Sequence, residues 1–338
     1  MTRILLALAL ASATLSAGEP VRIVFDTDMG NDVDDALALA MLHALESRGE
    51  ASILAVTITK DNRWAAPFVD LLDTFYGRPG IPIGIVRGGQ TQEDGNYTWV
   101  VAGKRRPGGA LVYPRQVMPE HDVPDAQIVL RRTLAAQPDS SVVIVQTGFS
   151  TNLARLLDSP ADAISPLAGR GLVERKVRLL VVMGGRFIDS ELEYNIMKDV
   201  PAAQKLFAAW PGPIAVSPWE LGAHANYPAV RLGHDFGYIP DHPLADAYRA
   251  YQKMPYDESL WDPTAALFAV RPDAGYFEVS AEGRISVDEK GVTTFSAGGG
   301  RQRILTASPE QRARIVEVVA ALASQPPAGG SVATSPGR

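Results

Sequence analysis

The segment VRIVFDTDMGNDVDDALALAMLHAL, residues 21–45, decides the fold class. Its first five residues form a short β-branched run, which is typical of a strand buried on both faces, and residues 35–45 have helical apolar spacing. Similar runs follow at 53–58, 81–86, 142–145, 177–183 and 214–216, with helical segments at 65–76, 126–136, 152–157 and 202–209. Strands that alternate with helices predict right-handed crossovers and a doubly wound, mostly parallel α/β sheet flanked by helices.

The later part of the chain has a different pattern. We expect helices at 244–252, 263–270 and 309–323, and a small C-terminal antiparallel meander made of segments 276–280, 284–287 and 292–295. The sequence has no internal repeat and no linker long enough to divide it. Residues 18–323 are therefore predicted to form a single domain.

Both ends of the chain are predicted to lie outside this domain. Residues 1–17 contain an early basic residue, Arg3, then an apolar run and small residues up to Ala17, which is typical of a secretory signal peptide. An N-terminal core helix or a retained anchor is the alternative. A signal peptide implies a secreted or periplasmic protein, and no other stretch is long and apolar enough to insert into a membrane. Residues 324–338, SQPPAGGSVATSPGR, are predicted to be a disordered tail.

The composition argues against several classes of protein. The 338 residues include 32 Lys and Arg against 38 Asp and Glu, a net charge of -6, with no basic run. Proteins that bind nucleic acid as a polymer usually carry a positive stripe that neutralises phosphates, so no such partner is expected. The chain has no Cys, which excludes thiol nucleophiles, disulfides and Cys-ligated metal sites.

Five aspartates follow the first predicted strand within ten residues: Asp26, Asp28, Asp32, Asp34 and Asp35. Ligands of doubly wound folds bind beyond the carboxyl ends of the strands, and converging buried carboxylates require a cation or protons. Oxygen donors alone favour a hard ion, Ca²⁺ or Mg²⁺. Capping of the next helix is the alternative, and it accounts for Asp34 and Asp35 but not for the residues on the strand end.

The motif DTDMGNDVDDA, residues 26–36, resembles DxDxGxDDA, the N-terminal signature of the inosine–uridine-type nucleoside hydrolases. It has two more residues between Gly30 and the Asp pair, so Asp32 and Asp34 are alternatives for one role, and Met29 replaces the usual Pro. Three further blocks resemble the family in the right order: TGFSTNLA at 147–154, VMGG at 182–185 with EYN at 193–195, and WDPTA at 261–265. The resemblance implies that residues 18–323 form a nucleoside hydrolase-like catalytic domain.

The resemblance also implies a Ca²⁺ cofactor. The equivalent ligands are Asp28, Asp35, Asp262 and the backbone carbonyl of Thr147, with Asp26 behind them. Asp28 would be the general base for a calcium-bound water that attacks the N-glycosidic bond of a ribonucleoside directly, releasing ribose and free base.

A further set of residues is implied to contact the ribose. These are Asp34 or Asp32, Asn62, Glu193 and Asn195. Lys60 follows the second strand beside the acidic site, where it either contacts the site or pairs with a carboxylate. Each block also has a purely structural explanation, because Asp262 can cap a helix, and Glu193 and Asn195 can belong to a solvated loop.

The leaving base is the least defined part of the predicted site. Many family members have a His before the last metal Asp, as a candidate acid, whereas this chain has Trp261 there. A Trp at this position resembles the purine-preferring branch, in which indoles sandwich the base, and Trp99 is the candidate second indole. Ordinary packing of both aromatic side chains is the alternative.

The resemblance thus predicts a hydrolase of purine ribonucleosides that acts in purine salvage and forms a dimer or tetramer. Hydrolysis of a different N-riboside and non-catalytic binding of a ribose or nucleoside remain as alternatives. A phosphohydrolase that begins with DxD is a further alternative, but it would need a basic phosphate-binding residue, for which Lys60 is the one candidate.

Overall fold

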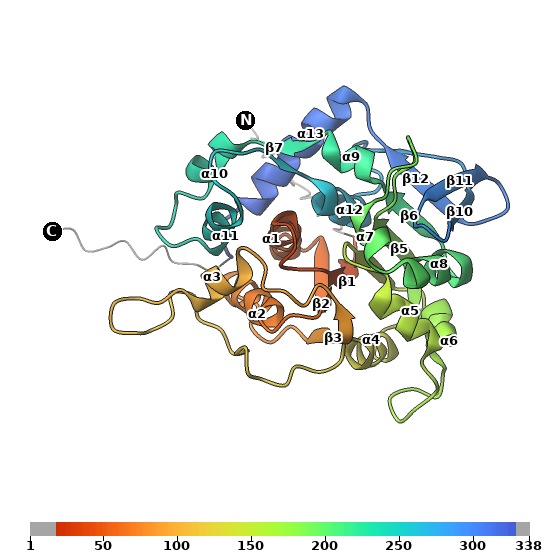
Figure 1. The fold of residues 1–338 in the computed structure, drawn as a ribbon, viewed down its shortest axis with the longest axis horizontal. Helices are drawn as coiled ribbons and strands as arrows, with labels where there is room; N and C mark the ends of the chain where they lie inside the picture. Colours follow the sequence, from red (N-terminus) through yellow and green to blue (C-terminus); the bar gives the residue numbers. More distant parts are fainter. Residues whose placement is uncertain (1–17, 329–338) are drawn as a thin grey trace, which may run out of the picture.

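The computed structural model describes residues 18–328 (Figure 1). The predicted signal peptide, 1–17, and residues 329–338 of the predicted tail lie outside the described residues. The first residues of that tail lie against the domain, since Gln325 accepts a hydrogen bond of 2.7 Å from Arg48 and donates one of 2.8 Å to Ser47. No helix within 18–328 has the length and apolar character needed to cross a membrane.

One ten-stranded sheet runs through the molecule in the order β11-β10-β12-β6-β5-β4-β1-β2-β3, with β9 paired to β12. Its strands are β1 (Val21–Thr27), β2 (Ala51–Lys60), β3 (Ile83–Gln90), β4 (Val142–Gln146), β5 (Val177–Met183), β6 (Ile214–Ser217), β9 (Glu278–Val279), β10 (Gly283–Val287), β11 (Thr293–Ala297) and β12 (Gln302–Thr306). All neighbours from β12 to β3 are parallel, which confirms the predicted doubly wound sheet. A separate ladder joins β7 (Asn226–Tyr227) to β8 (Glu258–Ser259).

Helices connect and cover the strands. They are α1 (Asp34–Ser47), α2 (Ala65–Phe75), α3 (Thr98–Gly103), α4 (Ala126–Ala135), α5 (Thr151–Asp158), α6 (Gly169–Lys176), α7 (Tyr194–Lys198), α8 (Val200–Ala209), α9 (Trp219–Ala223), α10 (Ala229–Asp235), α11 (Pro243–Tyr251), α12 (Trp261–Val270) and α13 (Pro309–Ala323). Helix α13 has the predicted bounds because Ser308 and Gln311 form a capping box at its start.

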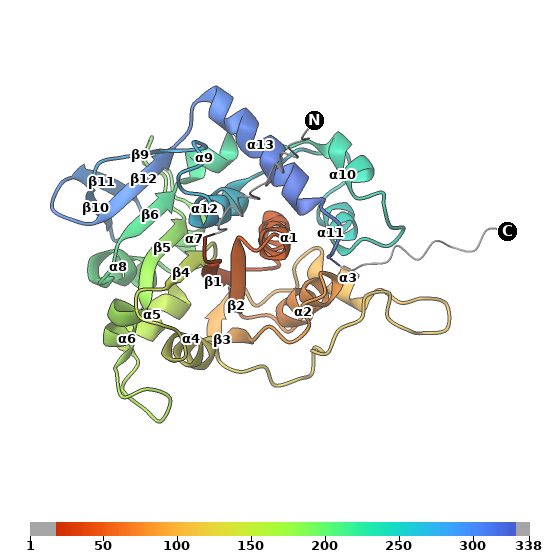
Figure 2. The same cartoon turned by 180° about the vertical axis from the view of Figure 1, so that it is seen from behind.

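Two hydrophobic cores lie on opposite faces of the sheet. Figure 1 shows α1, α12 and α13 on one side and α4, α5 and α8 on the other, and Figure 2 shows the same arrangement from behind. Successive residues of β1 point to opposite faces, so Ile23 and Phe25 pack in the core of α1 and α12 while Val24 packs with Leu130 and Leu153. This is why the strands read as continuous apolar runs.

The C-terminal antiparallel strands extend the main sheet. β10 and β11 pair antiparallel, as predicted, but β12 joins them to the parallel part by pairing with β6 at Arg303 and Ala215. The segment 276–280 was expected to pair within the meander; its strand β9 pairs with β12 instead, at Val279 and Leu305. Strand β12 itself was not predicted, because Ile304 and Leu305 are its only apolar residues and polar residues flank them.

Candidate active site

Segments far apart in the sequence meet at the carboxyl edge of the parallel strands. The loop between β1 and α1 contributes the aspartates, and the residues after β4 and β5 contribute Thr147, Glu193 and Asn195. The first turn of α12 contributes Asp262, and helix α12 packs against α1. The sequence-predicted residues of the acidic motif therefore come together at the edge where doubly wound folds bind ligands.

Three carboxylates lie close together at the carboxyl edge of the parallel strands. One oxygen each from Asp28, Asp32 and Asp35 lies within 4.8 Å of the others. Asp28 and Asp35 are buried and Asp32 is half-buried, at the surface of the cluster. Thr27 Oγ1 donates a short hydrogen bond to Asp35 Oδ1, and the other oxygen of Asp35 is buried without a hydrogen-bond partner.

Asp34 and Asp262 form the inner end of the cluster. The Asp262 backbone N–H donates a hydrogen bond of 2.9 Å to Asp34 Oδ2, so Asp34 holds the first turn of α12 in place. The Asp262 carboxyl group in turn lies against Asp35. Asp34 is fully buried near Glu258, a buried acid that the sequence reasoning missed because no motif surrounds it.

Asp26 and Thr147 hold the strands beneath the cluster together. Asp26 Oδ1 accepts hydrogen bonds from Thr57 at 2.6 Å and Asn152 at 2.8 Å, so this side chain links β1 to β2 and to α5 behind the cluster. The Thr147 carbonyl accepts a hydrogen bond of 2.7 Å from Asn195 Nδ2. The chain passes close beside Asp28 here because residue 148 is Gly: a Cβ would lie 2.6 Å from the Asp28 nitrogen.

The electrostatics of the cluster call for a cation. Burial raises the pKa of Asp28, Asp34 and Asp262 well above the ordinary range, and raises the pKa of Asp35 to about 7. One oxygen each of Asp34, Asp35 and Asp262 is buried without a hydrogen-bond partner in the described structure. Orphaned, like-charged oxygens of this kind fit a hard divalent metal ion, which neutralises them and needs only oxygen ligands.

Glu193 and Asn62 are already engaged by the backbone around them. Glu193 caps α7: its two oxygens accept hydrogen bonds of 2.9–3.0 Å from the N–H groups of Asn195, Ile196 and Gly185. Asn62 donates to the Gln92 carbonyl at 3.0 Å and to Asp94 at 2.9 Å. These bonds fix both side chains, and Glu193 and Asn195 also line the cavity beside the cluster.

A cavity of about 70 Å³, here called the inner cavity, adjoins the carboxylates. It is lined by Asp32, Met183, Glu193, Tyr194, Asn195, Trp219, Trp261 and Asp262. Trp261 Nε1 donates a hydrogen bond of 3.1 Å to the Trp219 carbonyl, and the Arg186 guanidinium lies 4.0 Å from the centre of the Trp219 ring. Sequence reasoning missed Trp219, although its position just after β6, at the same edge, was a usable signal.

The structure does not bring Trp99 into this cavity. Trp99 lies on α3 with 47% of its surface exposed, whereas Trp219 shares the inner cavity with Trp261.

A second space, here called the outer pocket, continues from the inner cavity. Its volume is about 420 Å³, and it shares Asp32 and Tyr194 with the inner cavity. Its lining residues are Gly30, Asn31, Asp32, Lys60, Glu93, Asp94, Gly95, Asn96, Tyr194 and Tyr251. The inner cavity has two indoles beside its carboxylates, and the outer pocket adds the charged side chains of Lys60, Glu93 and Asp94.

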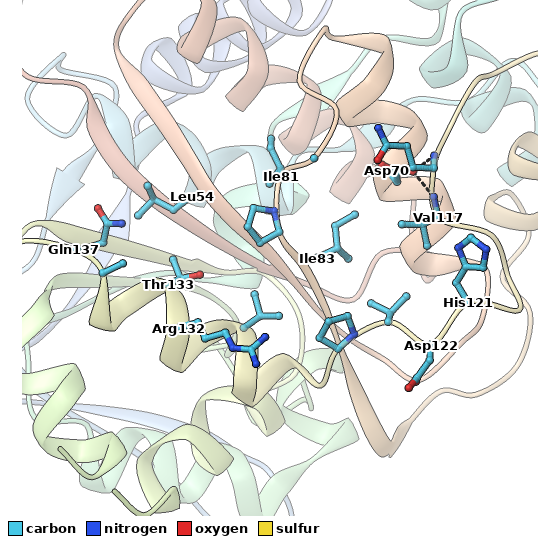
Figure 3. A pocket seen from close by; sticks show the side chains of 17 residues that line it. Leu54, Asp70, Ile81, Ile83, Val117, His121, Asp122, Arg132, Thr133 and Gln137 are labelled. Carbon is cyan, nitrogen blue, oxygen red and sulfur yellow. Dashed lines mark hydrogen bonds between the residues drawn. The ribbon is translucent and has the colours of Figure 1, made fainter. Parts of the chain in front are cut away.

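A larger cavity, of about 670 Å³, lies elsewhere, between α4 and the segment 116–124 (Figure 3). Its polar groups do not converge: Figure 3 shows Asp70 bonded to the backbone of residues 116 and 117, with Arg132 and Asp122 well separated. The candidate active site is therefore the acidic cluster and not this cavity.

Comparison with known proteins defines the class of this site. The family model described as inosine-uridine preferring nucleoside hydrolase matches residues 23–324, so the chain belongs to that family. Its members are metal-dependent glycosidases that act on N-glycosyl compounds, and this chain is a hydrolase of that class. No curated protein matches the sequence.

Solved structures of nucleoside hydrolases share the fold. The inosine-uridine preferring nucleoside hydrolase of Bacillus anthracis is 17% identical with a TM-score of 0.64, covering 90% of this chain and 99% of its own. An inosine-guanosine nucleoside hydrolase is 17% identical with a TM-score of 0.68, covering 89% and 98%. A purine-preferring ribonucleoside hydrolase of Gardnerella vaginalis is 16% identical with a TM-score of 0.65, covering 90% and 99%.

Proposed function

We propose that this protein hydrolyses the N-glycosidic bond of purine ribonucleosides at a Ca²⁺ site, giving ribose and free base. The observation that carries the proposal is the convergence of Asp28, Asp32 and Asp35 within 4.8 Å of one another. Asp262 lies against Asp35, and the chain at residue 148, next to Thr147, passes close beside Asp28. Carboxylate and carbonyl oxygens of this kind are the ligands that Ca²⁺ takes, in sets of about six to eight.

Bound Ca²⁺ supplies the charge that orients two ribose hydroxyls and lowers the pKa of a water. The protein residues do the rest. Asp28 accepts the proton of the attacking water, and the surrounding carboxylates stabilise the positive charge that grows on the sugar in the transition state. Glu193 and Asn195 are held by their hydrogen bonds at the edge of the inner cavity, where they contact the ribose.

The preference for purines rests on the aromatic lining. Trp261 and Trp219 border the inner cavity, and Tyr194 joins it to the outer pocket. A flat purine stacks well on such side chains. Two of the similar structures carry names with purine nucleosides in them, inosine-guanosine and purine-preferring.

The test is turnover of a nucleoside panel by the purified protein with Ca²⁺. We expect release of reducing ribose from inosine, guanosine and adenosine, and no phosphate from p-nitrophenyl phosphate. Turnover of uridine alone would contradict the purine preference, and Ca²⁺-dependent binding of inosine without turnover would contradict catalysis. The variant Asp28→Ala should lose turnover and bind Ca²⁺ more weakly by calorimetry; an active Asp28→Ala enzyme would refute the assigned base.

A further inference from the structure

Lys60 is a buried cation at the floor of the outer pocket. It ends β2, and 1% of its side chain is exposed. Its stem runs under the loop after β1, where Gly30 has a φ of 115°; a Cβ there would lie 3.2 Å from Lys60 Cδ. Gly at this position therefore lets the loop cover the lysine, whose side chain still lines the outer pocket.

The Lys60 ammonium group has one more N–H donor than it has partners among the described residues. Nζ donates to Asn31 Oδ1 at 2.9 Å and lies 3.7 Å from Glu93 Oε1. An ammonium carries three N–H donors, so these two partners leave a third donor for a ligand in the outer pocket. Burial lowers the pKa of Lys60, although the charges of Glu93 and Asp28 act against this, so its proton is easier to give up than that of an exposed lysine.

The proposed reaction needs a proton donor near the departing base. When the bond between the anomeric carbon and the base nitrogen breaks, negative charge collects on the departing base, and a proton from a positioned acid stabilises it. None of the five histidines lines the inner cavity or the outer pocket. Burial raises the pKa of the Tyr194 and Tyr251 phenols, which makes them poorer acids.

The other charged groups on the outer pocket are the carboxylates of Asp32, Glu93 and Asp94. Asp32 belongs to the metal cluster, Glu93 pairs with Lys60, and Asp94 accepts from Asn62. Asp32 is thus a proposed metal ligand, and Glu93 and Asp94 face the donors of Lys60 and Asn62, which leaves the lysine as the proton donor in this part of the site.

We propose that Lys60 is the acid that protonates the leaving base. This inference rests on the proposed nucleoside hydrolysis. Water gives its proton to Asp28 and its oxygen to the anomeric carbon, the C–N bond breaks, and Lys60 transfers one proton to a ring nitrogen of the base. Asp28 then releases its proton to solvent and the neutral Lys60 amine takes one up, so the sum is nucleoside plus water to ribose plus base.

The experiment compares leaving groups that do and do not need a proton. Wild-type protein and Lys60→Met are assayed on inosine and on p-nitrophenyl riboside, whose p-nitrophenolate leaves without protonation. We expect kcat on inosine to fall at least about 100-fold in Lys60→Met. The rate on p-nitrophenyl riboside should stay within about threefold of wild type, the range expected when no acid is needed.

The matched control is Asn31→Ala, which removes the residue that links Lys60 to Asp28. It should slow both substrates equally. If Lys60→Met also slows both equally, Lys60 only positions Asp28 and the proposal is wrong; unchanged inosine turnover overturns it as well. If Lys60→Met does not fold, Lys60→Arg replaces it in the comparison of the two substrates. Arginine keeps the positive charge but is a far weaker acid than lysine. Wild-type protein inactive on both substrates would instead refute the proposed function.

Discussion

Asn31 Nδ2 donates a hydrogen bond of 2.6 Å to Asp28 Oδ2. Asn31 belongs to the loop that is two residues longer than the family signature, and it accepts in turn from Lys60. A hydrogen bond to a carboxylate orients it and favours its ionised form. The longer loop therefore supplies a side chain that holds the proposed general base in position.

Asn31→Ala should lower kcat/KM on inosine by about 10- to 100-fold, because a hydrogen bond to a charged group contributes about 1.5–3 kcal/mol. The measurement is steady-state kinetics at saturating Ca²⁺. Gln137→Ala, between α4 and the amino end of β4 and so away from the carboxyl edge of the sheet, is the control and should keep wild-type kinetics. An Asn31→Ala enzyme with unchanged kcat/KM would show that Asp28 needs no such support.

The raised carboxyl pKa values predict how stability depends on pH without metal. Asp26 and Asp35 titrate near 7 in the folded protein against an ordinary value of 3.8, so the folded state binds more protons than the unfolded state between those values. Stability of metal-free protein should therefore fall as the pH rises from about 4 to about 7.

Thermal unfolding in a chelator and in Ca²⁺ across that pH range tests this. Ca²⁺ binds the deprotonated carboxylates, so the gain in Tm on adding Ca²⁺ should grow with pH. Mg²⁺ serves as the comparison ion and should give a smaller gain, because it keeps its waters and prefers octahedral geometry. A gain that is constant with pH would contradict a carboxylate site.

Much of the fold was predictable because buried parallel strands have a strong local signal. β1 and β5 are continuous apolar runs that fill both cores, and their positions follow from residues 21–25 and 177–183 alone. β12 has no such signal, since Gln302, Arg303 and Thr306 interrupt it. Its partners, β6 and β9, are fixed by tertiary packing.

The site was predictable to the extent that its residues lie in one motif. Which aspartate faces the ligand was not predictable, because a residue outside the motif fixes the conformation of the loop between β1 and α1. The Tyr97 hydroxyl accepts from the Gly30 N–H at 2.9 Å and donates to the Asp32 carbonyl at 2.8 Å. Tyr97 is more than 60 residues away in sequence, so local pattern alone carries no trace of this constraint.

Asp32 and Asp34 should therefore respond differently to the same substitution. Asp32 is one of the three converging carboxylates and lines both the inner cavity and the outer pocket. Asp34 instead accepts a hydrogen bond from the Asp262 backbone N–H. We expect Asp32→Asn to lower Ca²⁺ affinity at least about tenfold, because it removes a charged ligand. Asp34→Asn keeps an oxygen for the Asp262 N–H and should change the affinity less. Calorimetric titration of both variants measures this, and the reverse order would assign the ligand role to Asp34.

The indoles of the inner cavity should matter most for substrates with a purine. Trp261→Ala removes a stacking surface, which contributes about 1–3 kcal/mol per base, and also the hydrogen bond to the Trp219 carbonyl. We expect kcat/KM to fall about 5- to 150-fold on inosine and much less on p-nitrophenyl riboside.

Trp261→Phe keeps a ring but loses the hydrogen bond, so it should recover most of the inosine activity if stacking is what matters. Trp219→Ala should resemble Trp261→Ala, since both side chains line the same cavity. Trp99→Ala provides the comparison at an exposed indole outside both cavities and should have the smallest effect of the three. Equal losses on the two substrates in Trp261→Ala would mean that this indole supports the fold of the site and does not recognise the base.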